Sequence, residues 1–261
     1  MPWTHLVRFK FAILAQVIIL STPPLLAESI IEKYERAVVF LSGATEVGIS
    51  FGSGLQVARG DERFLVTAEH VVSPMIRDQK VLFRSESGKT SSLDLQTLAA
   101  DPDLNWIVNN KSDVAVLKIK GHPEFVASTL SISVSLLGTA PKERPLRMMG
   151  FPFGFGVEQE HFSPISKEVR QASGLLTLSV GEPKKRVTVF LLDDPSASGF
   201  SGGPVFLTPS YLAGGITTSD GREGRCVGIV SGVISDKTGG KFGTAIPASV
   251  ILETVELAAE N

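Results

Sequence analysis

Three short segments carry side chains that could act together in nucleophilic catalysis. The run Thr-Ala-Glu-His-Val-Val places His70 just after a strand-like stretch, and Ser-Asp-Val-Ala-Val-Leu-Lys places Asp113 directly before a strongly apolar stretch. The run Gly-Phe-Ser-Gly-Gly-Pro-Val places Ser201 between glycines, which suit a tight loop. Taken singly, each has an ordinary structural explanation, because most lone histidines are structural, aspartate favours turns before strands and glycine-rich runs often form hairpins.

The order His, Asp, Ser along one chain predicts more than the three segments do separately. Attack on a peptide carbonyl requires a serine activated by a base, and a carboxylate that holds the imidazole in one tautomer. It also requires N–H donors beside the nucleophile, each contributing roughly 3–4 kcal/mol to stabilisation of the oxyanion. The backbone N–H groups of Gly199 and Ser201 are candidates for these donors, and their small neighbours let a substrate approach the backbone.

The segments that must position these residues have the pattern of short β-strands. Runs of about four to eight β-branched or apolar residues, bounded by Gly, Pro, Ser or Asp, are typical of strands. These runs lie at residues 37–41, 48–51, 55–57, 64–67, 81–84, 114–119, 147–149, 175–178, 187–191, 204–207, 226–233 and 242–246. The strand signal is weakest at about 121–143, so we expect one β unit at about 37–121 and a second at about 140–246. Near-helical spacing of apolar residues predicts a terminal helix at about 247–259.

Composition limits the classes of protein to which the chain can belong. Of its 261 residues, 43% are hydrophobic and 20% are charged, so the chain can bury a core and is neither disordered nor a coiled coil. Its net charge of -2 lacks the basic excess of a general nucleic-acid binder. Because no Cys/His cluster has the spacing of metal ligands, we assign no metal and no cofactor. The single cysteine, Cys226, cannot form an intramolecular disulfide and is expected to be a buried apolar residue.

Residues 1–27 have the pattern of an export signal. A mildly basic start precedes an apolar run at residues 11–20, and Ser-Thr-Pro-Pro and the small residue Ala27 follow. That run is shorter than the ~20 residues needed to span a bilayer. We therefore expect cleavage after Ala27, with a retained N-terminal anchor as the alternative. A chain of residues 28–261 without disulfides suits a bacterial cell envelope, periplasmic or secreted, with no stable membrane insertion after cleavage.

Over residues 38–252 the sequence resembles the trypsin/chymotrypsin-like serine peptidases, and within them most resembles the HtrA/Deg-type bacterial branch. The resemblance implies that His70 is the general base, that Asp113 orients it and that Ser201 is the nucleophile. It also implies that Gly199 and Ser201 form the oxyanion hole. The implied fold is all-β, with two six-stranded antiparallel β-barrels, the active site in the cleft between them and a C-terminal helix.

Further segments support this resemblance. Gly-Ser-Gly at residues 52–54 resembles the glycine pair of the first barrel, and Gly-Phe-Pro-Phe-Gly at 150–154 resembles the turn that opens the second. Phe-Gly-Thr-Ala-Ile-Pro at 242–247 resembles the strand that ends it. The segment at 228–232 resembles the strand that pairs with bound peptide, which implies substrate-binding roles for the neighbouring residues Ser231, Gly232 and Val233.

Two features depart from the family pattern. Phe200 stands where the family usually has Asp or Asn, and a phenyl ring cannot form an ion pair with a newly cut N-terminus. Activation by N-terminal clipping is therefore not expected, and apolar packing must set the oxyanion loop, or a partner or substrate must order it. Only 14 residues follow Pro247, so we expect no peptide-binding PDZ domain of the kind that many HtrA-type proteins carry.

Substrate specificity is only partly readable from the sequence. Pro195 lies six residues before Ser201, at the position that sets the pocket floor in trypsin. Asp193 and Asp194 lie close by, so a small loop shift could bring a carboxylate to the floor. We expect a neutral pocket that accepts small or medium apolar side chains.

The sequence leaves two functions open. The first is an active, exported serine endopeptidase whose partners are protein or peptide substrates, and the presence of all the expected catalytic residues favours it. The alternative is a catalytically dormant protein of the same fold that binds peptides or proteins, and Phe200 favours that one. A lipase or esterase is not expected, because a serine elbow in an α/β sheet would require helices and a residue order that this chain lacks.

Overall fold

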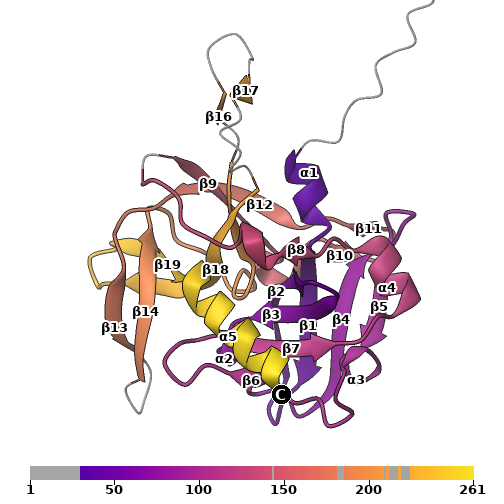
Figure 1. Ribbon diagram of the computed structural model, residues 1–261. Coiled ribbons are helices and arrows are strands. Elements are labelled where there is room, and N and C mark those ends of the chain that lie inside the picture. Colours follow the sequence, from indigo (N-terminus) through magenta and orange to yellow (C-terminus); the bar gives the residue numbers. More distant parts are fainter. Residues whose placement is uncertain (1–29, 143, 181–184, 209, 212–216, 219–223) are drawn as a thin grey trace, which may run out of the picture.

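The structure is a computed structural model. It describes residues 30–142, 144–180, 185–208, 210–211, 217–218 and 224–261 (Figure 1). The predicted export signal at residues 1–27 lies outside these residues. Among them, no helix is both long and apolar enough to cross a membrane.

The first sheet forms from the N-terminal half of the chain. Its strands are β1 (Val38–Ala44), β2 (Ile49–Arg59), β3 (Glu62–Thr67), β4 (Arg77–Arg84), β5 (Thr90–Asp94), β6 (Ile107–Val108), β7 (Ala115–Ile119) and β8 (Ile132–Ser133). They run in the order β5-β4-β1-β2-β3-β7-β6, and β8 adds to β2 in parallel. The short helices around this sheet are α1 (Ile30–Glu35), α2 (Glu69–Val72), α3 (Leu95–Leu98), α4 (Pro123–Ser128) and the 3-10 turn η1 (Val134–Leu136).

The second sheet forms from the C-terminal half, in the order β12-β9-β15-β18-β19-β14-β13. Its strands are β9 (Pro145–Gly150), β12 (Ile165–Arg170), β13 (Leu176–Val180), β14 (Lys185–Leu192), β15 (Pro204–Leu207), β18 (Cys226–Ser235) and β19 (Lys241–Pro247). The 3-10 turn η2 (Pro152–Gly154), the two-stranded ribbons β10 (Val157–Glu158) with β11 (His161–Phe162) and β16 (Ser210–Tyr211) with β17 (Thr217–Thr218), and the helix α5 (Ala248–Glu260) complete the described elements.

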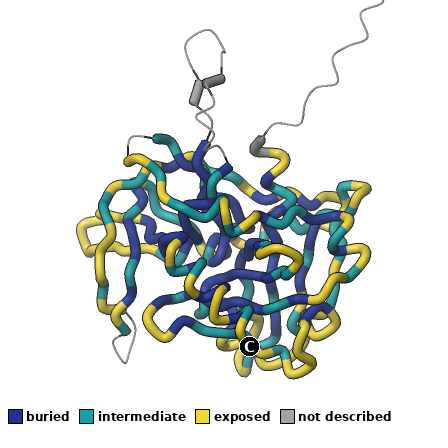
Figure 2. The backbone as a smooth tube through the Cα atoms, viewed as in Figure 1, coloured by how far each residue is buried: buried dark blue, intermediate teal, exposed yellow. Residues whose placement is uncertain are grey.

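Three apolar clusters hold these elements together. Alternation along β2 puts Leu55 and Val57 into a cluster that joins the two sheets, while Leu65 and Leu117 belong to a cluster within the first sheet. A third cluster fills the second sheet. Helix α5 contacts β3, β6 and β7 of the first sheet as well as β18 and β19 of the second. In Figure 2 the buried stretches of the backbone lie mainly in the interior, and the exposed stretches lie mainly at the periphery.

The predicted all-β class with a C-terminal helix is confirmed, and the strand pairs of both main sheets are antiparallel apart from β2 with β8. The described sheets contain eight and seven strands instead of six each. Neither closes through a continuous ladder within the described residues. The segment that follows α3 reaches β7 through the isolated bridge Ala99–Ile119, and the segment that follows β12 reaches β14 through the isolated bridge Gln171–Leu192.

Candidate active site

His70 lies on a single helical turn at the end of β3. Ala68 is extended, with φ −74° and ψ 138°, and the chain then turns into α2. Val71 and Val72 on the same turn are buried in the cluster of the first sheet, which anchors the turn. The His70 side chain is left 51% exposed, so the imidazole faces the space between the two sheets.

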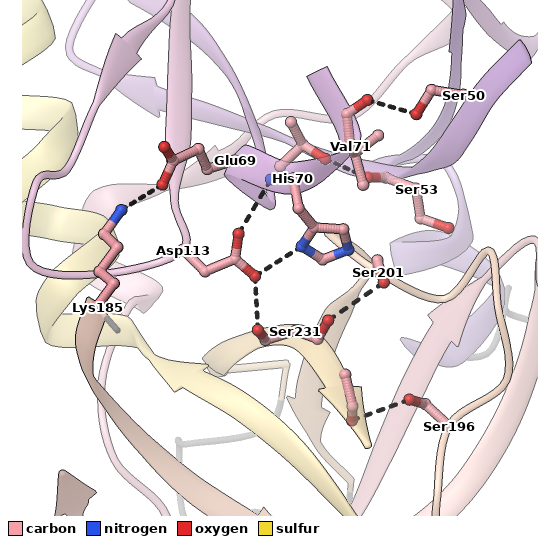
Figure 3. A network of polar contacts seen from close by, with 12 residues as sticks. Ser50, Ser53, Glu69, His70, Val71, Asp113, Lys185, Ser196, Ser201 and Ser231 are labelled. Carbon is pink, nitrogen blue, oxygen red and sulfur yellow. Dashed lines mark hydrogen bonds and ion pairs between the residues drawn. The ribbon is translucent and has the colours of Figure 1, made fainter. Parts of the chain in front are cut away.

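Asp113 holds His70 through both carboxylate oxygens. Its Oδ1 accepts from the His70 backbone N–H at 3.0 Å, and its Oδ2 lies 2.8 Å from His70 Nδ1 (Figure 3). Ser231 Oγ also donates to Oδ2, at 2.6 Å. Because an ionised carboxylate can only accept, Nδ1 must carry the proton, and Nε2 is left as an acceptor.

This pairing changes the acidity of both groups. Partial burial opposes protonation of His70, but its hydrogen bond to Asp113 and the negative charges of Asp113 and Glu69 together raise the pKa of His70 above its ordinary value of 6.5. Burial also opposes ionisation of Asp113, but the hydrogen bonds from His70 and Ser231 hold the pKa of Asp113 below its ordinary value of 3.8. Asp113 is therefore a carboxylate at neutral pH.

Ser201 lies beside the His70 ring in Figure 3, so the structure brings the three predicted residues together. The Ser201 hydroxyl donates to the backbone carbonyl of Ser231 at 3.2 Å. Within the described part of the chain it makes no hydrogen bond to His70 Nε2. Rotation of the Ser201 side chain about χ1 is the movement that would direct the hydroxyl to this nitrogen.

The backbone before Ser201 forms a turn with one defined orientation. Phe200 N–H donates to the Ala197 carbonyl at 3.1 Å, and Gly199 has φ +100°, which together identify a type II turn. The Ser198 carbonyl accepts from Phe153 N–H at 2.8 Å. Since C=O and N–H point to opposite sides of a trans peptide, the Gly199 N–H is directed away from Phe153.

The second candidate donor is oriented in the same way. The carbonyl of Phe200 accepts from the Gly203 N–H at 2.8 Å, which turns the Ser201 N–H to the opposite side of the peptide. Neither Gly199 nor Ser201 donates its N–H to an acceptor in the described part of the chain. Position 199 must be glycine, because a Cβ there would lie 2.3 Å from the Phe151 carbonyl oxygen.

Phe200 is buried beneath this turn, as its apolar character predicts. Its ring is 4% exposed and belongs to the apolar cluster of the second sheet, together with Met148, Val205 and Val230. The apolar ring occupies the interior side of the turn, while the candidate N–H donors lie in its backbone.

The segment before the turn has its carboxylates engaged elsewhere. Asp194 forms an ion pair with Lys167 at 2.7 Å, and Lys167 also donates to the Pro195 carbonyl at 3.0 Å. Asp193 Oδ1 accepts from the Arg170 N–H at 2.7 Å. Ser196 Oγ donates to the Gly232 carbonyl at 3.2 Å, so the segment is tied directly to β18 (Figure 3). These contacts leave a neutral boundary between residues 195–196 and β18.

A cleft of about 510 Å³ lies beside the His70–Asp113 pair. It is lined mostly by apolar surface from β13, β14 and β18, including Leu178, Val187 and Val233. The predicted substrate residues Ser231, Gly232 and Val233 line it, and Pro195 is not among the lining residues. A larger, more polar hollow of about 750 Å³ lies on the first sheet, near residues 76–79 and 94–104. No histidine or serine is among the residues that line it.

Two functional features were not predicted from the sequence. Lys185 on β14 forms an ion pair with Glu69 on α2, so a charged contact joins the two halves next to His70 (Figure 3). Ser53 on β2 bonds to the Gly199 carbonyl, behind the candidate donors. The sequence analysis interpreted only the glycines of the Gly-Ser-Gly run, and nothing in the run indicated a role for the serine between them.

Cys226 is buried, and burial raises its pKa to about 12, so it is no reactive thiol. Within the described residues, no group of three or more His, Cys, Asp or Glu side chains could hold a metal ion.

Two antiparallel β units with His70, Asp113 and Ser201 grouped between them define the class of chymotrypsin-like folds. The chain belongs to the trypsin-like peptidase domain family, whose family model matches residues 52–214. The predicted trypsin-like family is thereby confirmed. No curated protein matches the sequence.

Solved structures agree on the fold. A serine endoprotease from Yersinia pestis is similar with a TM-score of 0.55 at 18% identity; the match covers 89% of this chain and 66% of that one, so this chain spans slightly less than two thirds of its length. The thermostable serine protease AL20 from an extremophilic microorganism has a TM-score of 0.51 at 11% identity, covering 87% and 99% of the two chains. Human heparin binding protein has a TM-score of 0.52 at 13% identity, covering 88% and 93%.

Proposed function

We propose that this protein is an exported serine endopeptidase that cleaves peptide bonds through Ser201, His70 and Asp113. The observation that carries the proposal is the 2.8 Å contact between His70 Nδ1 and Asp113 Oδ2, with Ser201 beside the ring (Figure 3). That contact leaves Nε2 as the acceptor that a nucleophilic serine requires. Membership of the trypsin-like peptidase domain family supports the same chemistry.

In the proposed mechanism, the side chain of Ser201 first rotates from the Ser231 carbonyl to His70. Nε2 takes the hydroxyl proton as Oγ attacks the substrate carbonyl, and the carbonyl oxygen becomes an oxyanion that the Gly199 and Ser201 N–H groups bind. The imidazolium then gives its proton to the leaving amine, and an acyl-enzyme remains. Water deacylates this ester by the same route, with His70 again acting as base.

The substrate is proposed to be an extended peptide that pairs with the β18 edge at Ser231–Val233. A neutral subsite for a small or medium apolar side chain is supported by the hydrogen bond of Asp193 to the Arg170 backbone N–H and by the ion pair of Asp194 with Lys167. The contact of Ser196 with Gly232 brings the two sides of that subsite together, which disfavours bulky side chains. A peptide library should therefore show cleavage after residues such as Ala or Val rather than after Lys, Arg or Trp.

Export is part of the proposal and rests on the sequence of residues 1–27. The mature protein is expected to begin near Glu28, outside the cytoplasmic membrane of a bacterial cell. Mass spectrometry of the native protein tests this. A species that retains Met1 and fractionates with membranes would instead support an N-terminal anchor.

The catalytic proposal is tested by labelling residues 28–261 with a serine-directed fluorophosphonate probe. We expect labelling of the unmutated protein at Ser201 and none of Ser201→Ala. A denatured sample controls for nonspecific reaction. Absence of labelling in a folded, unmutated protein would reject the active enzyme.

The second candidate is a dormant, peptide-binding protein of the same fold. The hydrogen bond from Ser201 to the Ser231 carbonyl favours it, because in this arrangement the hydroxyl is not directed at its base. A dormant protein would bind peptides along β18 with unchanged affinity in Ser201→Ala and would not react with the probe.

A further inference from the structure

Ser53 is a fully buried serine whose backbone and side chain both bond to the turn that carries Ser201. Its N–H donates to the Ser201 carbonyl at 2.8 Å, and its hydroxyl donates to the Gly199 carbonyl at 2.7 Å. One residue of the first sheet thus binds the two carbonyls on either side of Phe200. These bonds fix the peptide planes that follow Gly199 and Ser201.

The other polar groups of Ser53 are also partnered. The Phe151 N–H donates to Ser53 Oγ at 3.0 Å, and Thr67 Oγ1 donates to the Ser53 carbonyl at 2.7 Å. The hydroxyl therefore bridges the turn at Gly199 and Phe151, the residue just before the Pro-Phe-Gly turn η2. From η2, Phe153 N–H in turn binds the Ser198 carbonyl at 2.8 Å. β2, η2 and the turn before Ser201 form one connected network.

We propose that Ser53 is a positioning residue that presets the oxyanion-binding turn. The Phe200 side chain packs below the turn but is apolar and cannot hydrogen-bond to the Gly199 or Ser201 carbonyl, so the directional bonds to these two groups must come from another residue. Ser53 supplies both of these hydrogen bonds, and the residues of β2 on either side of it are buried as well. This inference rests on the proposed function, because the orientation of the Gly199 and Ser201 N–H groups matters for catalysis only if an oxyanion forms there.

The hydrogen bonds of the Ser53 hydroxyl favour one conformation of the turn, because their loss would cost free energy. Without Ser53 Oγ, the Gly199 carbonyl and the Phe151 N–H would both be buried without partners, and an unsatisfied buried group is costly. The turn could recover a partner by rotating the 199–200 peptide. Such a rotation would also move the neighbouring 198–199 peptide, and with it the Gly199 N–H.

The test compares Ser53→Ala with Thr129→Val, a control on the far side of the first sheet. Thr129 is also buried, and its hydroxyl donates to the Phe125 carbonyl of α4 at 2.5 Å. We expect Ser53→Ala to lower kcat on a peptide substrate about 10-fold or more, with KM changed less than about two-fold, because loss of one oxyanion donor costs about 10²–10³ in kcat. Thr129→Val, which also removes one buried hydroxyl, should lower Tm but keep kcat.

A second measurement does not depend on activity. Amide hydrogen exchange at residues 197–203 should be faster in Ser53→Ala than in the unmutated protein, and unchanged in Thr129→Val. Unchanged exchange at 197–203 in Ser53→Ala, or a fall in kcat no larger than that of the control, would overturn the positioning role. If the unmutated protein neither labels nor turns over, the proposed enzyme fails, and the exchange result still decides whether Ser53 holds the turn.

Discussion

At the scale of single residues, the orientation of His70 depends on one carboxylate used twice. Asp113 binds both the backbone N–H and the ring Nδ1 of His70, so the ring plane and the tautomer are set together. Ser231, which lies on β18 of the second sheet, donates a further hydrogen bond to the same carboxylate. A hydrogen-bonded carboxylate in this position stabilises the imidazolium that forms during catalysis.

The pH dependence of catalysis follows from this arrangement. His70 accepts the Ser201 proton only when the imidazole is neutral, so kcat/KM should rise with pH through the pKa of His70. Because Asp113 and Glu69 raise that pKa despite burial, the midpoint should lie above 6.5. A pH profile of kcat/KM on a peptide substrate measures it. A flat profile between about pH 5 and pH 8 would contradict a histidine base.

Asp113→Asn tests whether Asp113 orients His70 and raises its pKa. It removes the charge that raises the pKa of His70, so the midpoint should move to lower pH, and it permits the wrong tautomer. We expect kcat to fall about 10⁴-fold, with the fold unchanged by circular dichroism. A variant with near-normal kcat would show that Asp113 does not orient the base.

Phe200 makes a separate contribution to the turn, through packing. Phe200→Ala removes a ring that is 4% exposed, so the Gly199 and Ser201 donors should loosen and kcat should fall about 10-fold or more, while binding of a long peptide changes less. Phe200→Leu is the control that keeps apolar volume. Phe200→Asp should be no more active than Phe200→Ala, because it places a charged carboxylate within an apolar cluster. Undiminished turnover in stably folded Phe200→Ala would show that packing does not set the turn.

At the scale of elements, the site depends on contacts between segments far apart in the chain. The turn α2 carries His70 and is joined to β14 by the Glu69–Lys185 ion pair, while β18 reaches Asp113 through Ser231. Both contacts cross from the first sheet to the second. They therefore link the relative position of the two sheets to the geometry around His70.

The Glu69–Lys185 ion pair should influence the pKa of His70. Lys185→Ala leaves the Glu69 charge uncompensated near His70, and a nearby negative charge favours the imidazolium. The midpoint of the kcat/KM profile should therefore move to higher pH, with a loss of stability no larger than about 1 kcal/mol because the pair is partly exposed. Adding Glu69→Gln to Lys185→Ala should reverse the pH shift. A midpoint that moves to lower pH in the single variant would contradict this account.

Element boundaries show where the sequence pattern was misleading. The runs at 48–51 and 55–57 were expected as separate strands, but they form the single strand β2, because the glycines at 52 and 54 lie within its pairing with β1. Strands β5 and β12 are absent from the expected set, because their sequences Thr-Ser-Ser-Leu-Asp and Ile-Ser-Lys-Glu-Val-Arg are mostly polar. Backbone pairing with neighbours, which polar side chains do not oppose, places both segments in the sheets.

At the scale of the whole molecule, α5 joins the two sheets. Ile251 and Val255 on its buried face belong to the cluster that also contains Val116 of the first sheet and Ile229 of the second. The helix lies across the front of the view in Figure 1 and ends near the first sheet. Its packing gives the two halves a shared core, so we expect them to unfold together.

Truncation on the buried face of α5 tests this shared core. Ile251→Ala should lower the free energy of unfolding by about 2–5 kcal/mol, because a fully buried side chain is lost and a cavity remains. Leu257→Ala, on the exposed side of the same helix at 43% exposure, should change it by less than about 0.5 kcal/mol. Urea unfolding followed by fluorescence and by circular dichroism measures both. Two separate transitions would show that the halves unfold independently.

The sequence by itself determined the fold class and the three residues of the candidate site. Periodic apolar runs are a local property, and the His, Asp and Ser segments each combine a chemical group with the turn or strand that carries it, so both can be read along the chain. It also identified Phe200 as a departure from the family pattern. Only the tertiary structure decided which groups complete the site. Ser53 with Gly199, Glu69 with Lys185 and Asp194 with Lys167 are pairs separated by many residues, and their types alone do not reveal them. Hydrogen bonds and ion pairs act over a few ångströms, so which residues form them is decided by how the two sheets pack and not by spacing in the sequence.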